Sequence, residues 1–246
     1  NDGATSYFHK SIGGYHAAKL GRYQDLIDFR LQNEINQLIT GLQNDQGVNL
    51  QEQLRGLSSL HMLNTKYIIY NPQAPPIVNP YADGNAWFVK HYELVDNANE
   101  ELNLLGNIDP KTVALVDKRH AAQLSSLTMS YNENNQISLL DYQSNHLTYN
   151  STADSDQLAV FSEIYYEEGW NAYIDGELTP HFRCDYTLRA LLVPEGEHTI
   201  EFIFEPQSYY QGERIALIGS IFLLLALLGI FGRELAIFYQ SSKKEL

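Results

Sequence analysis

A long apolar run near the end of the sequence constrains the fold more than any other feature. Residues 215–231 read IALIGSIFLLLALLGIF and contain no charged side chain. As an α-helix this run is about 26 Å long, which is within the range that spans a bilayer's hydrocarbon core. A buried helix of a soluble domain is the weaker alternative, because such helices are seldom apolar on every face over this length. The run therefore predicts a transmembrane helix.

The charges on either side of the run predict its orientation. Residues 1–214 hold 13 Lys and Arg against 28 Asp and Glu, whereas residues 215–246 hold 3 against 2. The positive-inside rule then places the C-terminal tail in the cytoplasm. Arg214 is the one charge that does not fit this rule, because it lies on the outer side of the run. We expect an extracytoplasmic part over residues 1–213, a transmembrane helix with its extension over residues 214–240, and a cytoplasmic tail over residues 241–246.

The composition of the chain narrows its partners. A formal net charge of −14 argues against nucleic acid, because no basic patch is available to neutralise phosphates. The single cysteine, Cys184, excludes an internal disulfide. The sequence begins without Met and without a signal peptide, so we expect it to be the C-terminal part of a longer membrane protein. The expected partners are the lipid bilayer and the upstream transmembrane helices of that protein.

Helical and strand patterns alternate in the first half of the sequence. The predicted elements are helices over residues 22–40, 49–62 and 97–105 and strands over residues 65–70, 86–95 and 112–116. The strand at residues 65–70 is expected to be buried because it is rich in Tyr and Ile. Two later strands joined through a helix suggest a βαβ unit, so residues 1–120 are predicted to form a small α/β domain. No Gly-rich phosphate loop accompanies it, and no cofactor is indicated.

Short strands separated by turn residues dominate the second half. Candidate strands cover residues 127–131, 136–142, 146–149, 158–166, 170–174, 186–193 and 199–204. Asp175-Gly176 is a strong signal for a tight turn. This pattern predicts an antiparallel β-sandwich of jelly-roll or immunoglobulin-like type over residues 121–213. The predicted fold class is α+β, with a C-terminal transmembrane helix.

Several motifs carry a resemblance to a known family. They are YYEEGWNAYIDG at residues 165–176, YTLRA at 186–190, VPEGEHTIEF at 193–202, SYFHKSIGGYH at 6–16 and MLNTKYII at 62–69. Together they resemble the C-terminal ectodomain of the YfhO family of bacterial membrane proteins. One departure lies in this turn. The family commonly has a Pro before Gly-Trp, whereas this chain has Glu167-Glu168 and is one residue longer there.

The resemblance implies a setting for the chain. Members of the family are polytopic proteins of the bacterial cytoplasmic membrane, thought to be glycosyltransferases that take sugar from a lipid-phosphate carrier and decorate cell-surface polymers. Their acidic catalytic residues are expected in loops between early transmembrane helices, which lie outside this sequence. No catalytic residue is therefore assigned in this chain. We predict that residues 1–246 alone have no transferase activity.

An aromatic cluster provides the candidate sugar contacts. Aromatic rings suit the apolar faces of sugars, and polar groups nearby can hydrogen-bond the hydroxyls. Strand alternation places Trp170 and Tyr173 on opposite faces, so at least one of them is expected in the core. The candidate contacts are Tyr165, Tyr166, Trp170, Tyr173, Asp175 and Arg189.

Other chemical patterns are weaker. Asp154 and Asp156 match an Asp-x-Asp metal motif, but they lie in a polar run that is typical of a turn. His9 and His16 have no ligand-like partner at a suitable spacing, so packing in an aromatic loop is favoured over metal binding. No metal site and no nucleophile-base motif are predicted.

Two functions of different classes remain open. The chain is either the ectodomain and last helix of a glycosyltransferase, close to a lipid-linked sugar or an envelope glycan, or a non-catalytic module that binds glycan or has a structural role. Further transmembrane spans upstream, with an acidic pair in the first extracytoplasmic loop, would distinguish the enzyme from the module.

Overall fold

The computed structural model describes residues 3–13, 19–43, 49–125 and 127–242. The chain divides into two compact units, one of residues 1–167 and 171–203 and the other of residues 168–170 and 204–246. The two units are described separately.

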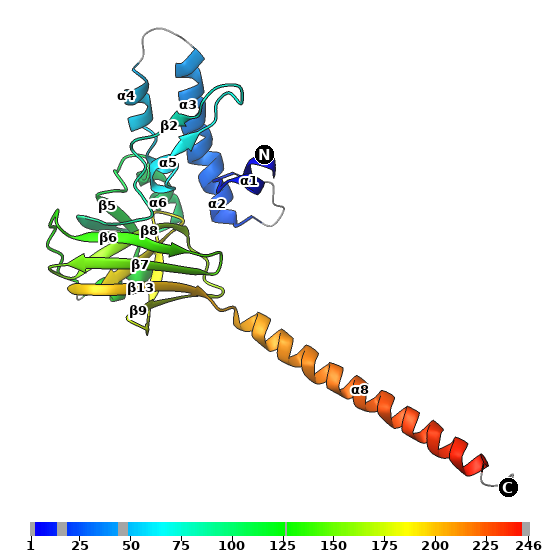
Figure 1. The fold of residues 1–246 in the computed structure, drawn as a ribbon. Helices are drawn as coiled ribbons and strands as arrows, with labels where there is room; N and C mark the ends of the chain where they lie inside the picture. Colours follow the sequence, from blue (N-terminus) through cyan, green and yellow to red (C-terminus); the bar gives the residue numbers. More distant parts are fainter. Residues whose placement is uncertain (1–2, 14–18, 44–48, 126, 243–246) are drawn as a thin grey trace. The chain divides into compact units, whose positions relative to one another are not determined.

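The first unit contains helices, several of which gather on one side of its sheets (Figure 1). They are α1 (Gly3–Phe8), α2 (Gly21–Leu26), η1 (Ile27–Leu31), α3 (Gln32–Gln43), α4 (Leu50–Arg55), α5 (Ser58–Met62), α6 (Ala98–Leu104), η2 (Lys118–His120) and α7 (Ala121–Leu124). The amphipathic helix predicted over residues 22–40 is confirmed as the continuous run α2–η1–α3, which buries Leu26, Leu31 and Leu38. The helix predicted over residues 49–62 is interrupted at Gly56, which ends α4.

The strand predicted over residues 65–70 is the clearest error of the first half. Only β1 (Tyr67–Ile68) forms, and it pairs with β2 (Ile77–Val78) in a separate two-stranded sheet. Tyr67 is 64% exposed, whereas Ile68 is half-buried and packs against the core. A pair of two-residue strands has no third strand to cover its outer side, so β propensity alone did not predict which side chains are buried.

A six-stranded sheet lies against the helices and closes on itself. Its strands are β3 (Ala86–Phe88), β4 (His91–Val95), β5 (Val113–Asp117), β8 (Gln157–Ile164), β11 (His181–Cys184) and β12 (Leu188–Val193), in the order β3-β8-β12-β11-β5-β4. The two edge strands, β3 and β4, are joined only by Val89 and Lys90, so the sheet must curl until its edges meet. Both corner residues stay paired, because Val89 N donates to Leu158 O and Lys90 N to Thr112 O.

Two sequence predictions concern strands of this sheet. The single strand predicted over residues 86–95 is present as two strands that pair with different neighbours. The predicted βαβ unit is confirmed, because β4 and β5 are parallel and α6 connects them. The sheet also contains strands from both sides of residue 120. The division of the chain into domains at residue 120 concerns which segments fold alone, and it stays a prediction.

A five-stranded antiparallel sheet completes the sandwich (Figure 1). Its strands are β6 (Gln136–Tyr142), β7 (His146–Ala153), β9 (Trp170–Ile174), β10 (Glu177–Thr179) and β13 (Gly196–Phe204), in the order β10-β9-β13-β7-β6. Phe202 and Tyr149 from this sheet meet Phe161 of β8, with ring centroids 4.8 and 4.9 Å from that of Phe161. The predicted β-sandwich is confirmed, although residues 127–131 form no strand.

The second unit contains the long apolar helix α8 (Gln207–Ser242). Residues 207–237 of it are long and apolar enough to cross a membrane. Large apolar side chains are exposed all along the predicted run, from Ile215 to Phe231. A helix that is apolar on every side and is not buried in protein is suited to a lipid environment, as the sequence predicted.

Candidate functional site

The predicted sugar contacts of the first unit do not form a single platform. The Tyr165 ring packs beside the His181 ring, with centroids 5.4 Å apart, and Tyr166 is partly exposed. Arg189 is only 2% exposed and lies beneath the Phe202 ring, with its Nε donating to Ile164 O at 3.2 Å. Burial lowers the pKa of Arg189 to about 10. Its guanidinium is therefore enclosed between the sheets, away from the surface.

Asp175 closes the predicted turn between β9 and β10. Asp175 and Gly176 both have positive φ, 52° and 83°, and they connect paired Ile174 and Glu177. The Asp175 carboxylate accepts from His198 Nδ1 at 2.7 Å and from Thr199 N at 2.9 Å. The bond from His198 lowers the pKa of Asp175 and raises the pKa of His198. The predicted hydrogen-bonding carboxylate thus stabilises a turn.

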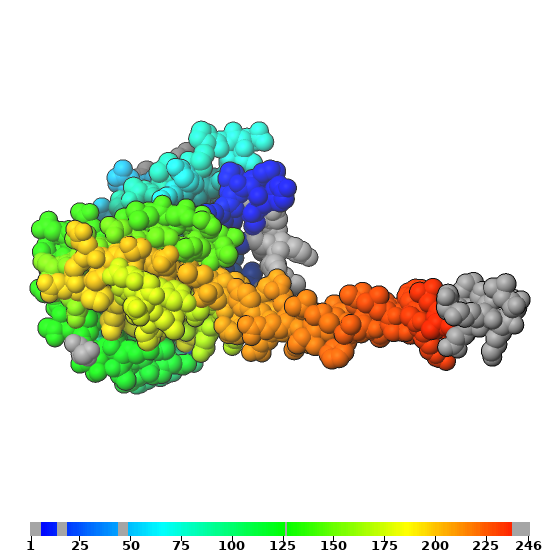
Figure 2. All heavy atoms as spheres, turned by 60° about the horizontal axis from the view of Figure 1, so that its bottom comes forward, coloured from blue at the N-terminus to red at the C-terminus, as the bar shows by residue number. Residues whose placement is uncertain are grey.

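Tyr173 lies on the outer face of the five-stranded sheet. Its neighbours Ala172 and Ile174 are buried, so alternation directs Tyr173 outward. The same face carries the pair of His146 Nε2 and Glu201 Oε1, 2.8 Å apart. Figure 2 shows the strands of this sheet, green to yellow, as a continuous surface. This face is polar, and Tyr173 is the predicted sugar contact that fits it best.

Trp170 belongs to the second unit, where it packs against Phe204 with ring centroids 5.3 Å apart. Gly169 has φ +120°, and a Cβ there would lie 2.9 Å from the Phe204 ring and 3.0 Å from Pro206. Its carbonyl accepts from Glu205 N at 2.6 Å. The Gly-Trp motif therefore holds the segment that leads into α8. Sugar binding by the six predicted residues is not tested by these contacts and stays a prediction.

Two buried carboxylates lie beside the six-stranded sheet, and one of them, Glu101, connects it to the helices. Glu101 of α6 is fully buried, and it accepts from Arg22 at 3.0 Å and from Tyr186 N at 2.8 Å. Asp185, also fully buried, accepts from Leu115 N at 2.8 Å. Burial raises the pKa of both carboxyls. Asp185 and Tyr186 have φ of 45° and 69°, a conformation that costs about 1–3 kcal/mol per residue and that these hydrogen bonds help to hold.

Asp83 is a further buried carboxylate near α5. It is 9% exposed, its backbone N donates to His61 O, and its carbonyl accepts from Lys111 Nζ. Burial raises the pKa of Asp83 to about 7, although the charge of Lys111 opposes this shift. Burial also lowers the pKa of Lys111.

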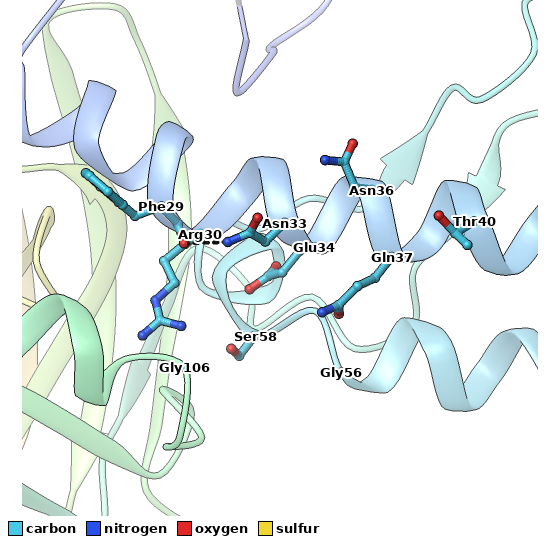
Figure 3. Close-up of a pocket in the computed structure, with 10 residues that line it drawn as sticks. All are labelled: Phe29, Arg30, Asn33, Glu34, Asn36, Gln37, Thr40, Gly56, Ser58 and Gly106. Carbon is cyan, nitrogen blue, oxygen red and sulfur yellow. Dashed lines mark hydrogen bonds between the residues drawn. The ribbon is translucent and has the colours of Figure 1, made fainter.

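A polar groove runs along α3, facing Gly56 and Ser58 (Figure 3). The groove is open to solvent and has a volume of about 620 Å³, within the usual range of ligand pockets of about 300–1,000 Å³. Phe29 lies near one end and Thr40 near the other (Figure 3). Between them the groove is lined by amide side chains, Asn33, Asn36 and Gln37.

The two charged residues of the groove are both bound within the protein. Arg30 donates through Nε to Leu102 O at 2.8 Å and through Nη2 to Asn103 O, so it caps the C-terminal end of α6. Glu34 accepts from Ser59 N at 2.9 Å and Leu60 N at 3.1 Å. Burial raises the pKa of Glu34.

Sequence patterns could have revealed the buried carboxylates. Glu34 follows the apolar positions Ile27 and Leu31 at helical spacing, and Glu101 follows Ala98 on the inner side of α6. A charged residue on an apolar helix face is a signal for a buried polar network. The groove had no such signal, because its amides look like an ordinary solvated helix face.

The two aspartates considered as metal ligands form hydrogen bonds within the protein. Asp154 accepts from the Asn132 side chain, and Asp156 accepts from Glu195 N at 3.0 Å. His9 is exposed, and His16 lies outside the described residues. Within the described part of the chain, no three His, Cys, Asp or Glu side chains are grouped so as to hold a metal ion.

Comparison with known protein families tests the resemblance noted in the sequence. Residues 111–216 match the family described as bacterial membrane protein YfhO. The YfhO segment runs from just before β5 into α8 and contains the motifs at residues 165–176, 186–190 and 193–202. The motifs at residues 6–16 and 62–69 lie outside it. The YfhO match and the apolar helix support membrane association. Comparison with the curated proteins and with the solved structures finds no match.

Proposed function

We propose that this chain is the C-terminal extracytoplasmic portion and last transmembrane helix of a membrane-embedded glycosyltransferase. The whole protein would transfer sugar from a lipid-phosphate carrier to a polymer of the cell envelope. The observation that carries the proposal is the YfhO match over residues 111–216, which continues into an apolar helix. The chemical step is assigned to upstream residues, and this chain contributes a surface for the glycan.

The transfer reaction is tested with the full-length protein in proteoliposomes. A radiolabelled sugar on a polyprenyl-phosphate carrier is supplied together with envelope polymer, and label in the polymer is measured. We expect transfer by the full-length protein and none by residues 1–246 alone. Absence of transfer from every carrier-linked sugar tried would contradict the proposed activity, and transfer by residues 1–246 would contradict the assignment of catalysis to upstream residues.

The orientation of the chain is tested by cysteine labelling. Cys184 is the only cysteine and is fully buried. It is therefore not expected to react, and labelling reports only the engineered cysteine. In intact spheroplasts, a membrane-impermeant maleimide is expected to label Ser144→Cys, because Ser144 is exposed on the loop between β6 and β7. Lys244→Cys is expected to react only after permeabilisation. The opposite pattern would reverse the topology.

The second candidate function is a non-catalytic module that binds an envelope glycan or has a structural role. The polar groove favours its glycan-binding version, since the groove is lined by neutral hydrogen-bonding groups. The glycosyltransferase and the glycan-binding module both place a glycan on this chain. They differ in the transfer assay, where the module has no activity in any form of the protein.

A further inference from the structure

We infer that the groove along α3 binds a segment of neutral oligosaccharide. Phe29 would stack on the apolar face of one sugar ring, while the amides of Asn33, Asn36 and Gln37 hydrogen-bond the hydroxyls of the next rings. That this glycan is the acceptor polymer rests on the proposed function. The binding itself is argued from the groove alone.

The hydrogen-bonding groups of the groove match sugar hydroxyls. A hydroxyl both donates and accepts, and a carboxamide offers donors and an acceptor on one planar group. Asn33 uses one N–H on Phe29 O at 3.0 Å, and Asn36 uses its oxygen on Gln32 at 3.1 Å, which leaves further donors and acceptors on both. Among the described residues, the side chains of Gln37 and Thr40 have no hydrogen-bond partner. The groove therefore presents unused polar groups in a row along one helix.

The charges of the groove favour a neutral ligand. Arg30 is bound to the last carbonyls of α6, and Glu34 is bound to the first N–H groups of α5. A phosphate or carboxylate ligand would need a cation that is not already engaged. An apolar helix would leave the amides of the groove without partners, which is costly when they are desolvated. A neutral polyhydroxylated chain has neither problem.

Phe29 supplies the aromatic surface, and the local backbone accounts for its position. It is 60% exposed and lies on η1, a π-helical turn in which Gln32 N donates to Ile27 O. Such turns are rare and occur frequently at functional sites, because the wider turn redirects its side chains. Gly106 allows Arg30 to reach α6, since a Cβ there would lie 2.1 Å from the guanidinium. The π-helical turn and Gly106 thus set the local structure at the end of the groove that carries the Phe29 ring.

The test uses the whole 246-residue chain in phospholipid nanodiscs, because maltoside detergents would themselves present sugars to the groove. An array of neutral oligosaccharides built from hexose and N-acetylhexosamine units is screened, and the best binder is titrated by calorimetry. Phe29→Ala and Gln37→Ala are each expected to weaken binding about five- to tenfold, the loss of one stacking or hydrogen-bonding contact. Alanine favours the helix, so both variants should fold.

The controls are matched exposed residues outside the groove. Tyr67→Ala removes an aromatic ring that is 64% exposed, and Gln51→Ala removes an exposed amide on α4. Both should bind within about twofold of the unmodified chain, as expected for surface changes away from a site. The inference is overturned if no neutral oligosaccharide binds, if phosphorylated oligosaccharides bind in preference, or if the groove variants bind as tightly as the controls.

The outcome is separable from that of the proposed function. Transfer by the full-length protein, without oligosaccharide binding in this groove, would keep the enzyme and remove the inference. Binding that depends on Phe29 and Gln37, without transfer under any condition, would keep the inference and remove the enzyme.

Discussion

The six-stranded sheet is held to its two neighbours by different chemistry. Toward the five-stranded sheet, the aromatic rings of Tyr149, Phe161 and Phe202 surround basic groups, Arg189 and His181, whose charged forms are disfavoured. On the side of the helices, Glu101 of α6 accepts from Tyr186 N in the turn between β11 and β12, and other buried carboxyls lie nearby. They are Glu34 between α3 and α5, Asp185 beside β5, and Asp83 near α5. The side toward the five-stranded sheet therefore buries bases, whereas the side of the helices buries acids.

This difference gives the two interfaces opposite pH responses. Burial lowers the pKa of His181 to about 4, so the folded state binds fewer protons there and stability falls on acidification from about pH 6.5 to pH 4. Burial raises the pKa of Asp83 to about 7, so the folded state binds more protons there and stability falls as pH rises from about 4 to 7. A single pH titration of unfolding thus contains two opposing contributions.

The largest expected effect is on the aromatic interface. Phe161→Ala should lower the free energy of unfolding by about 3–5 kcal/mol, because it removes a fully buried ring and leaves a cavity beside Tyr149 and Phe202. Urea denaturation measures this change. Leu140→Ala, at an exposed position on β6, is the control and should change stability by less than about 0.5 kcal/mol. Similar losses in both variants would mean that the two sheets are not packed as described.

The next effect is on the acidic interface. Glu101→Gln should lower the free energy of unfolding by about 2–3 kcal/mol, because one amide oxygen cannot replace both carboxylate oxygens for Arg22 and Tyr186 N. Glu93→Gln on exposed β4 is the matched control. An unchanged midpoint for Glu101→Gln would show that this carboxylate contributes no net stability.

A smaller effect should appear as stabilisation. Asp83→Asn removes a buried carboxylate whose ionisation opposes folding, so at pH 8 the variant should be more stable than the unmodified chain by about 2 kcal/mol. The gain should disappear by pH 4, where Asp83 is neutral in the folded state. Thermal melts across this range measure the difference. Destabilisation at pH 8 would instead show that attraction to Lys111 outweighs burial.

The smallest effect tests the basic interface. His181→Gln should reduce the stability lost between pH 7 and pH 4.5 by about 1 kcal/mol, because glutamine cannot be protonated in the unfolded chain. The measurement is the same series of melts. If the slope stays the same in this variant, another group governs the acid response.

Local chemistry made some elements predictable and left others hidden. Asp175-Gly176 was predicted as a turn because few residues adopt two successive positive φ values, and the apolar run was predicted because no soluble surface fits it. The closure of the six-stranded sheet depends on which strands pair with residues 86–88 and 91–95, and alternation does not specify partners. The groove depends on how α3 packs against the turn at Gly56, which no local pattern encodes.

The most direct test of the account is a hydrogen-exchange footprint of the bound oligosaccharide. The whole chain in nanodiscs is compared with and without the best neutral binder. We expect slower exchange in residues 29–40 and 56–60 and no change in β7, β9 and β13. Protection of the outer sheet face around Tyr173, with none along α3, would contradict the groove and favour the aromatic contacts predicted from the sequence.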